Sequence, residues 1–459
     1  MNQNKKVLQF VLTATLCLLT FSLFIHFNKV QNEQLQNINI LSSVLQQDDF
    51  TAKHNKSNID TSFKNIDTSQ TIVLNSDSLA RQLQHFNVAN RLTNFSGDTS
   101  AIVLDNFIKK LIALRKNKKG KIRIAYLGDS MIEGDLVTQT IRKYLQQNFG
   151  GRGVGFVPIT SAVAGFRQTV KHTFTANWKE SNFKNKFSAV PLYLSGKTFF
   201  ASGYNRVDIE DKTVAAIASP LKKYLLCGYK PLTGQIAVNS IFNAIKPAQT
   251  FNRILIDSSA KTSIKLEASD VALPFYGISI ETNDGVIVDN FSFRGLGGFE
   301  FMNIDSSFLK QVAATQPYDL IIMQYGVNLL NHPNNNSFGW YYKAMFSCIN
   351  KLKSCFKGTD FLLVSSADKS FKYSNGTHTA IGMDSLIATQ ERIAFDSKIA
   401  FFNTYSSMGG YNSMVNWANG NPQLAAKDYT HLNAKGAEVL GTGIYNAFMF
   451  EVGKIERQK

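Results

Sequence analysis

Apolar runs and helical patterns alternate along two parts of the chain. Residues 122–127 (Ile-Arg-Ile-Ala-Tyr-Leu) have the character of a buried strand, with helical patterns before them at 102–114 and after them at about 136–147. The alternation returns after residue 319, with strands expected at 319–325, 361–365 and 399–404 and helices at 340–356, 383–395 and 434–450. This order predicts an α/β fold in which helices cover both faces of a parallel sheet.

The pattern changes between these two parts. From about Phe166 to Pro274, short β-rich runs are separated by polar turns, and no long helical pattern interrupts them. The runs lie at 190–194, 198–201, 214–217, 235–238, 253–256 and 263–266. Short strands at this spacing predict a β-sandwich, which we place at 166–274 as an insertion between α/β parts at 77–165 and 275–459. We expect residues 276–281 and 286–293 to lead back into the parallel sheet.

The N-terminal segment has a different character. Residues 7–25 form an uncharged apolar run of about 19 residues, which is long enough to cross the hydrocarbon layer of a membrane as a helix. Lys5 and Lys6 precede it and favour a cytoplasmic N-terminus. No small-x-small cleavage site follows, so an uncleaved signal anchor is preferred to a cleaved signal peptide. We expect a cytoplasmic tip and transmembrane helix at 1–27, a flexible linker at 28–76, and the rest of the chain outside the cytoplasm.

Composition narrows the class of partner. Hydrophobic residues make up 44% of the 459 residues, which is ample for a folded core. The formal net charge of +16 suits an anionic partner such as nucleic acid, lipid headgroups or an acidic polymer. The basic residues are scattered and no zinc-finger or RNP-type motif is present, so nucleic acid is the least favoured partner. The histidines and the four cysteines show no metal-ligand spacing, and we expect no metal and no cofactor.

Two motifs carry candidate reactive groups. Gly128-Asp129-Ser130 follows the first strand, where an α/β sheet opens its ligand crevice. A serine there can be a nucleophile if a base reaches it, although the tripeptide also fits an ordinary turn. In Asp428-Tyr429-Thr430-His431, the carboxylate can hold the imidazole while the other ring nitrogen accepts a serine proton. A turn that caps the closing helix is the alternative for this tetrapeptide.

Two further motifs carry candidate hydrogen-bond donors. Asn328 follows the strand at 319–325, and its side-chain amide can donate to a negatively charged oxygen at a strand end. Gly295, Gly297 and Gly298 follow the β run at 286–293, where a glycine lets a backbone N–H approach a ligand closely. Each of these motifs also fits a tight turn.

Taken together, Ser130, Gly295, Asn328 and His431 resemble the four blocks of the SGNH (GDSL-like) hydrolase family in order and context. The resemblance implies a three-layer α/β sandwich and a serine esterase activity. It implies that Ser130 attacks the ester carbonyl, His431 is the general base and Asp428 orients His431. It also implies an oxyanion hole made by the backbone N–H groups of Ser130 and Gly295 and the side-chain amide of Asn328.

The resemblance covers about residues 102–450 without the insertion, and it has departures. The family usually has an acidic residue after the asparagine, and here Leu329 follows Asn328. We favour Gly295 over Gly297 and Gly298 because Phe-Ser-Phe-Arg-Gly aligns best with the family's glycine turn. No G-x-S-x-G motif is present, which argues against an ordinary α/β-hydrolase.

The insertion indicates which group of enzymes within this family the chain resembles. Ser130 and Gly295 are separated by far more residues than one crossover needs. A β-sandwich at this place is similar to the carbohydrate-binding-like module inside bacterial peptidoglycan O-acetylesterases, and residues 276–281 and 427–432 also resemble that group. This implies removal of O-acetyl groups from peptidoglycan or another envelope polysaccharide. The anchor would then be a single pass through the bacterial inner membrane, with the catalytic domain on the periplasmic or extracellular side.

Two alternatives stay open. The same triad would serve an SGNH-type polysaccharide O-acetyltransferase, which would work with a membrane-bound acyltransferase partner. A non-catalytic glycan-binding protein is the second alternative, because the acidic residue after Asn328 is missing. Aromatic side chains that can stack on sugars or belong to the core are Trp178, Tyr193, Tyr204 and Trp417.

Overall fold

A computed structural model describes most of the chain after the N-terminal segment. The described residues are 83, 88–95, 98, 100–213, 220–231, 234–242 and 245–457. The predicted membrane anchor at 1–27 and the linker at 28–76 lie outside them. Within the described part, no helix combines the length and the apolar composition needed to cross a bilayer.

The centre of the α/β part is a parallel sheet with strand order β1-β19-β16-β15-β2-β14. Its parallel strands are β2 (Lys121–Gly128), β14 (Gly285–Ser292), β15 (Leu320–Gln324), β16 (Asp360–Val364) and β19 (Ala400–Phe402), and β1 (Leu92–Thr93) runs antiparallel at one edge. Their side chains are buried on both faces, which explains the continuous apolar runs in the sequence. The mixed α/β class and the parallel sheet are thus confirmed.

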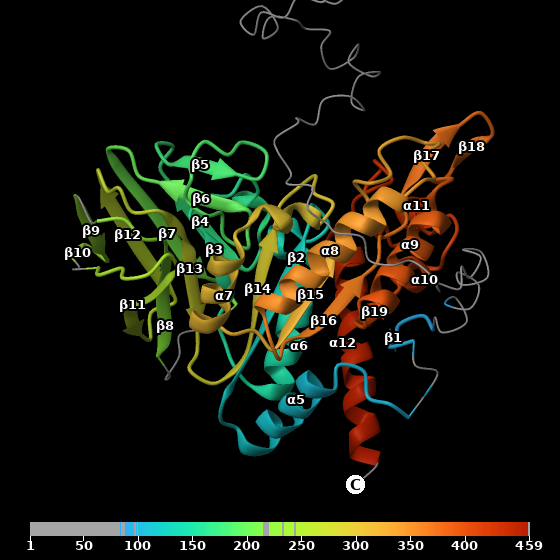
Figure 1. Cartoon of the computed structure of the whole chain (residues 1–459), viewed down its shortest axis with the longest axis horizontal. Helices are drawn as coiled ribbons and strands as arrows, with labels where there is room; N and C mark the ends of the chain where they lie inside the picture. Colours follow the sequence, from blue (N-terminus) through green and yellow to red (C-terminus); the bar gives the residue numbers. More distant parts are fainter. Residues whose placement is uncertain are drawn as a thin grey trace, which may run out of the picture. The chain divides into compact units, whose positions relative to one another are not determined.

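Helices cover both faces of this sheet (Figure 1). Along β2, Ile124 and Tyr126 pack in one hydrophobic cluster, while Ala125 and Leu127 pack in another on the opposite face. The first cluster contains residues of α5 (Asp105–Asn117), α6 (Leu136–Phe149), α10 (Thr404–Met408), α11 (Ser413–Asn419) and α12 (Ala434–Arg457), and the second contains residues of α7 (Ser306–Thr315), α8 (Gly339–Cys355) and α9 (Met383–Asp396). The result is a helix–sheet–helix arrangement of three layers.

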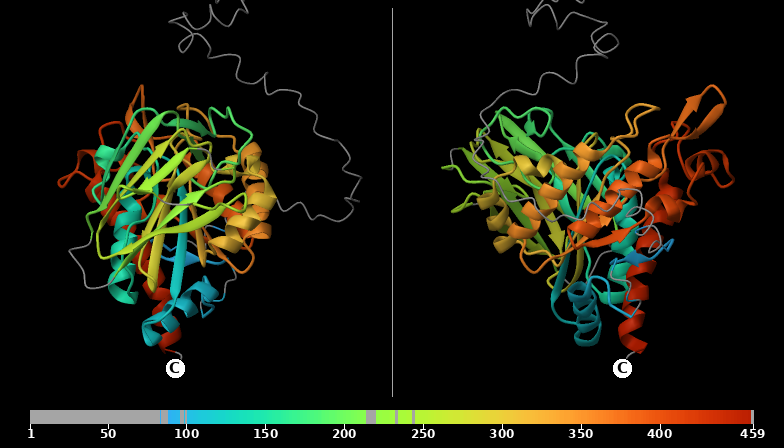
Figure 2. Two further views of the ribbon diagram at one scale, coloured as in Figure 1. Left: turned by 90° about the vertical axis from the view of Figure 1, so that its left-hand side faces the viewer. Right: turned by 45° about the vertical axis from the view of Figure 1, so that its right-hand side comes forward.

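Two antiparallel sheets form the inserted sandwich, drawn in green beside the parallel sheet in Figures 1 and 2. One has the order β10-β9-β12-β7-β4, and the other has the order β11-β8-β13-β6-β5 with β3 paired to β13. The strands are β3 (Gly155–Pro158), β4 (Val170–Phe174), β5 (Lys179–Asn182), β6 (Lys197–Phe200), β7 (Tyr204–Asp211), β8 (Leu221–Cys227), β9 (Gln235–Val238), β10 (Ile241–Phe242), β11 (Asn252–Ser259), β12 (Ser263–Ser269) and β13 (Phe275–Glu281). Alternate side chains such as Val207, Ile209 and Leu225 meet between the two sheets.

The sandwich extends beyond the range 166–274 expected from the sequence. Ile278 on β13 pairs with Val157 on β3 and with Leu225 on β8, so both flanking strands belong to the sandwich. Residues 276–281 therefore do not return to the parallel sheet, whereas the next run does so as β14. A buried apolar run has the same appearance in either sheet, which is why the pattern alone misplaced this strand.

One predicted strand in the sandwich is absent and another cannot be compared. Residues 190–194 form no strand, because Leu192, Tyr193 and Leu194 enter the core from a loop. The run at 214–217 lies outside the described residues.

A buried ionic network joins the sandwich to the parallel sheet. Arg123 on β2 pairs with Asp289 on β14 at 2.7 Å and also with Glu281 on β13. Arg253 on β11 reaches the same Glu281 carboxylate at 2.5 Å. The two sheet systems are therefore tied by charges as well as by packing.

Candidate active site

Ser130 lies in the turn directly after β2, at the carboxyl end of the parallel strands. The turn is tight at Gly128, where a Cβ would come within 2.8 Å of the Ile132 side chain and 3.1 Å of the Gln324 carbonyl oxygen on β15. A short 3-10 helix, η2 (Glu133–Asp135), follows and leads into α6. The hydroxyl is therefore presented on a rigid strand–turn–helix unit.

The imidazole of His431 connects Ser130 with Asp428. Nε2 of His431 lies 2.9 Å from Oγ of Ser130, and Nδ1 lies 2.7 Å from Oδ2 of Asp428. With the Nδ1 proton donated to the carboxylate, the Nε2 lone pair faces the serine hydroxyl. The structure thus brings together the three side chains that the sequence singled out from opposite ends of the folded part.

Local hydrogen bonds hold the Asp428 carboxylate in its charged form. Oδ1 accepts the backbone N–H groups of Thr430 and His431, each at 3.0 Å. Partial burial raises the pKa of Asp428, but the hydrogen bonds from His431 and Thr430 outweigh it and keep the pKa below its usual value. The side chains of Asp428 and His431 are 50% and 43% exposed, so the site opens to solvent.

The loop that carries Asp428 and His431 is supported by a neighbouring hairpin. Ser370, the first residue of β17 (Ser370–Tyr373), donates its backbone N–H to the Tyr429 carbonyl at 3.0 Å. β17 pairs with β18 (Gly376–Thr379). Just before the hairpin, the Lys369 ammonium donates to the Val327 carbonyl at 3.1 Å, next to Asn328. The hairpin base therefore links the Asp428–His431 loop with the Asn328 loop.

Asn328 is held by groups that the sequence did not indicate. Its side-chain nitrogen lies 2.9 Å from Oδ2 of Asp129 and 3.0 Å from the Leu296 carbonyl oxygen. The position after Asn328, where the family usually has an acidic residue, is occupied by Leu329, whose side chain packs in the hydrophobic core. The carboxylate that anchors Asn328 comes instead from Asp129, beside the candidate nucleophile.

Asp129 is a fully buried carboxyl group with two donors. The backbone N–H of Met131 donates to its Oδ1 at 2.9 Å, and Asn328 donates to its Oδ2. Burial raises the pKa of Asp129 to about 7, against the lowering effect of the Met131 hydrogen bond and of the nearby His431. Asp129 therefore orders the turn through Met131 and also orients Asn328.

The three candidate glycines in the loop after β14 differ in whether their backbone N–H groups already have an acceptor. The N–H groups of Gly297 and Gly298 donate to the Glu300 carboxylate at 3.0 and 2.8 Å. Gly295 has a positive φ of 76°, and within the described part of the chain no acceptor takes its N–H. Of the three, Gly295 is the one whose amide stays available to a ligand.

An ion pair joins the glycine loop to the serine turn. Nη2 of Arg294 lies 2.7 Å from Oε2 of Glu133, and Nε of Arg294 lies 2.9 Å from the same oxygen. Arg294 directly precedes Gly295, and Glu133 follows Ser130 by three residues. No local sequence signal predicts this contact, because the two partners are far apart in the chain.

Comparison with known proteins gives matches to solved structures. No protein-family model and no curated protein matches the sequence. A peptidoglycan O-acetylesterase structure is 21% identical and aligns with a TM-score of 0.67 over 79% of this chain and 99% of its own. The chain has the SGNH-hydrolase fold. The α/β part alone makes up less than 79% of the chain. The alignment with the peptidoglycan O-acetylesterase therefore includes the inserted sandwich.

Other solved structures align over shorter stretches of the chain. An acetyl xylan esterase is 16% identical and covers 36% of this chain and 82% of its own, with a TM-score of 0.29. A carbohydrate acetylesterase from Sinorhizobium meliloti is 16% identical and covers 35% of this chain and 77% of its own, with a TM-score of 0.25.

The aromatic residues proposed to stack on sugars divide into buried and accessible groups. Tyr193 is fully buried and Trp178 nearly so, and both belong to hydrophobic clusters. Trp417 is partly buried against the core of the α/β part. Tyr204 is 51% exposed and donates to Glu267 at 2.7 Å. Tyr193 and Trp178 therefore cannot contact a glycan in this fold.

Proposed function

We propose that the chain is a serine esterase that removes O-acetyl groups from peptidoglycan or another cell-envelope polysaccharide. The observation that carries this proposal is the continuous contact Ser130–His431–Asp428 at the carboxyl ends of the parallel strands. A hydroxyl, a neutral imidazole nitrogen and an orienting carboxylate in this order form an activated nucleophile. The fold shared with a peptidoglycan O-acetylesterase supports the choice of substrate.

In the proposed mechanism, Oγ of Ser130 attacks the acetyl carbonyl while Nε2 of His431 accepts its proton. The tetrahedral intermediate collapses when His431 returns that proton to the sugar oxygen, which leaves acetyl-Ser130 and a free hydroxyl. Water then attacks the acyl-enzyme with His431 as base, and acetate and free Ser130 result. Asp428 stays ionised throughout and stabilises the imidazolium.

The developing oxyanion needs donors close to Ser130. We assign the backbone N–H groups of Ser130 and Gly295 and the side-chain amide of Asn328, and the loss of one such donor typically costs about 3 kcal/mol. In the free site both amide hydrogens of Asn328 face other acceptors, Asp129 and Leu296. Asn328 therefore has to share one hydrogen with the oxyanion, whereas no described residue accepts the N–H of Gly295.

The exposure of the site favours hydrolysis over acetyl transfer. With half of the Asp428 side chain and nearly half of His431 exposed, water reaches the acyl-enzyme freely. A transferase has to keep water away from the same intermediate. The apolar run at 7–25 supports a further part of the proposal, that the enzyme is anchored in a bacterial inner membrane with its site on the outer side.

Acetate release tests the proposed reaction. The detergent-solubilised full chain should release acetate from O-acetylated peptidoglycan, and Ser130→Ala should lower turnover by roughly a thousandfold or more, because the nucleophile is lost. Adding a de-acetylated glycan acceptor distinguishes the alternatives, since a transferase would form acetylated acceptor in place of free acetate. Undiminished turnover by the Ser130→Ala protein would refute the proposal.

A further inference from the structure

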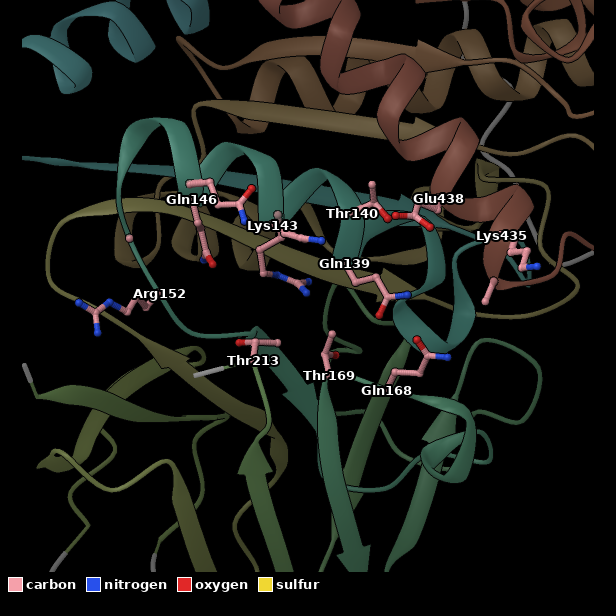
Figure 3. Close-up of a pocket in the computed structure, with 14 residues that line it drawn as sticks. Gln139, Thr140, Lys143, Gln146, Arg152, Gln168, Thr169, Thr213, Lys435 and Glu438 are labelled. Carbon is pink, nitrogen blue, oxygen red and sulfur yellow. The ribbon is translucent and has the colours of Figure 1, made fainter. Parts of the chain in front are cut away.

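A polar groove outside the triad runs between helix α6 and the edge of the sandwich (Figure 3). Its volume is about 620 Å³, within the range of natural ligand sites. One wall consists of α6 and the first turns of α12. The other wall is formed at the sandwich by Gln168, Thr169 and Thr213. The inserted domain thus contributes directly to a cavity beside the catalytic part.

The groove is lined by four amide side chains, and three of them have no hydrogen-bond partner among the described residues. Gln139 and Gln147 on α6 and Gln168 on the facing wall make no side-chain hydrogen bond to any residue that the structure describes. Gln146 donates to the carbonyl oxygens of Gly153 and Val286, each at 3.0 Å, and keeps its own oxygen free. Gln139, Gln147 and Gln168 each offer two donors and an acceptor, and Gln146 offers an acceptor, which matches the hydroxyl and N-acetyl groups of sugars.

The groove also has an uncompensated positive charge. Lys143, Arg152 and Lys435 line it without an ion pair in the described part of the chain, and Glu438 is the acidic residue among them. Arg142 lines it too, but Asp135 neutralises that guanidinium at 2.6 and 2.9 Å. Free cations beside free amides suit a ligand that carries carboxylates among polar neutral groups.

One end of the groove is formed by residues that are close in sequence to Ser130 and His431. Gln139 is in the first turn of α6, which begins six residues after Ser130. Lys435 is in the first turn of α12, which begins three residues after His431. From Gln139 to Gln146 the groove follows α6 for about 10 Å at 1.5 Å per residue, and it ends near Arg152 beyond the helix. A polymer in the groove would therefore lead away from the reacting ester.

We propose that this groove binds a strand of an acidic, N-acetylated glycan, the polymer whose acetyl ester reaches Ser130. This inference rests on the proposed esterase function and specifies its substrate class. The amides bind the neutral sugar groups, and Lys143, Arg152 and Lys435 bind carboxylates along the strand. The sandwich contributes to glycan binding through its edge at Gln168 and Thr213, whereas its buried aromatic residues do not contact the glycan.

A charge reversal with a matched control tests the groove. In Lys143→Glu/Arg152→Glu, we expect KM for O-acetylated peptidoglycan to rise about tenfold, equivalent to ~1.4 kcal/mol, with kcat unchanged. The rate on a small chromogenic acetyl ester, which is too short to extend into the groove, should stay as in the wild type. The control Lys310→Glu/Lys357→Glu makes the same change in net charge at exposed lysines away from the groove and should leave KM within about twofold. Equal KM values in the groove and control variants would overturn the proposal.

Binding separates a failure of the groove from a failure of the esterase function. We would measure cosedimentation of Ser130→Ala protein with de-O-acetylated peptidoglycan, with and without Lys143→Gln/Arg152→Gln, which removes the charges without reversing them. Loss of binding in the charge-neutral variant supports the groove even if no ester is hydrolysed. Unchanged binding overturns the groove. The esterase proposal then stands if Lys143→Gln/Arg152→Gln protein that keeps Ser130 still hydrolyses the small ester.

Discussion

At the residue scale, the proposed reactivity of Ser130 depends on the orientation of one imidazole ring. Asp428 holds Nδ1 of His431, so Nε2 is the nitrogen that faces Oγ of Ser130. A second chain of contacts runs from Asp129 to Asn328. Asp129 and Ser130 are neighbours in sequence, so one turn positions both the nucleophile and the anchor of a candidate oxyanion donor.

We predict that Asp129→Asn lowers kcat about tenfold to a hundredfold on a small acetyl ester. An asparagine has one acceptor oxygen, so either Met131 or Asn328 loses its partner, and a buried donor left without a partner costs about 1–3 kcal/mol. The variant should also change how stability depends on pH. Burial raises the pKa of Asp129 from its ordinary value of 3.8 to about 7.

The sign of this pH effect follows from proton binding. Between about pH 4 and pH 7 the folded state keeps a proton on Asp129 that the unfolded chain has released, so wild-type stability falls as pH rises through this interval. Urea unfolding of both proteins from pH 4 to 7.5 should show the wild type losing roughly 2–4 kcal/mol relative to Asp129→Asn. A constant difference across the interval would contradict the assignment.

The sequence predicts the residue-scale contacts that are local or lie at strand ends. Asp428 and His431 are three residues apart, so their contact follows from one turn. Ser130 and His431 meet because their loops lie at the same edge of the sheet. The partner of Asn328 was not predictable, because Leu329 is part of the apolar core and the anchor comes from another strand end.

At the element scale, the packing of α6 against α12 positions Ser130 relative to His431. Ser130 precedes α6, and His431 precedes α12. The two helices touch at Gly441, where a Cβ would lie 2.8 Å from both the Thr140 Cβ and the Val137 carbonyl oxygen. Because a backbone carbonyl cannot move away cheaply, this glycine sets how closely the two helices approach.

We predict that Gly441→Ala separates the two helices and damages the site. Overpacking should cost about 1–3 kcal/mol of stability, and displacement of His431 from Ser130 should lower kcat/KM by roughly tenfold to a hundredfold. The control Gly453→Ala lies on the same helix, where only the flexible Arg457 side chain is near. It should keep full activity and gain up to about 1 kcal/mol. Equal behaviour of the two variants in thermal unfolding and ester hydrolysis would refute this role.

The elements differ in how well the sequence predicted them. The strands of the parallel sheet are long apolar runs between helical patterns, so their type and order were predictable. β3 has only four residues, and Gly277 on β13 allows the Val157 carbonyl to approach so closely that a Cβ would lie 2.4 Å away. Such backbone contacts define the sandwich edge, and no hydrophobic pattern encodes them.

At the scale of the whole molecule, the sandwich and the α/β part share a core. Leu226 and Tyr276 of the sandwich belong to the same hydrophobic cluster as Leu127 and Ile321 of the parallel sheet. The Glu281 carboxylate, fully buried, reaches across the boundary to Arg123. The insertion is therefore an integral part of the fold. Its edge at Gln168 and Thr213, unlike its interior, lines the groove beside α6.

We predict that Glu281→Gln destabilises the whole molecule by about 3–5 kcal/mol, because it leaves buried Arg123 with only one of its two anionic partners. Burial opposes the charge of Glu281, but Arg123, Arg253 and Lys121 outweigh it and hold its pKa well below the usual range. The stabilisation is therefore present above the ordinary glutamate pKa and is lost as pH falls through the lowered value.

Urea unfolding at pH 7 provides the measurement for Glu281→Gln. Tryptophan fluorescence reports on both parts, since Trp178 lies in the sandwich and Trp340 and Trp417 lie in the α/β part. We expect one transition, shifted to lower urea in the variant. The control Asp208→Asn breaks an exposed pair with Arg206 and should leave the midpoint unchanged. Two separate transitions in the wild type would contradict a shared core.

Covalent labelling of the nucleophile is the most direct test of the central claim. A fluorophosphonate probe reacts with a serine only when a base has activated it. Peptide mapping by mass spectrometry should find the adduct on Ser130 in the wild type, and His431→Ala should abolish labelling while the protein stays folded. Labelling at another serine, or equal labelling of Ser130 without His431, would contradict the account.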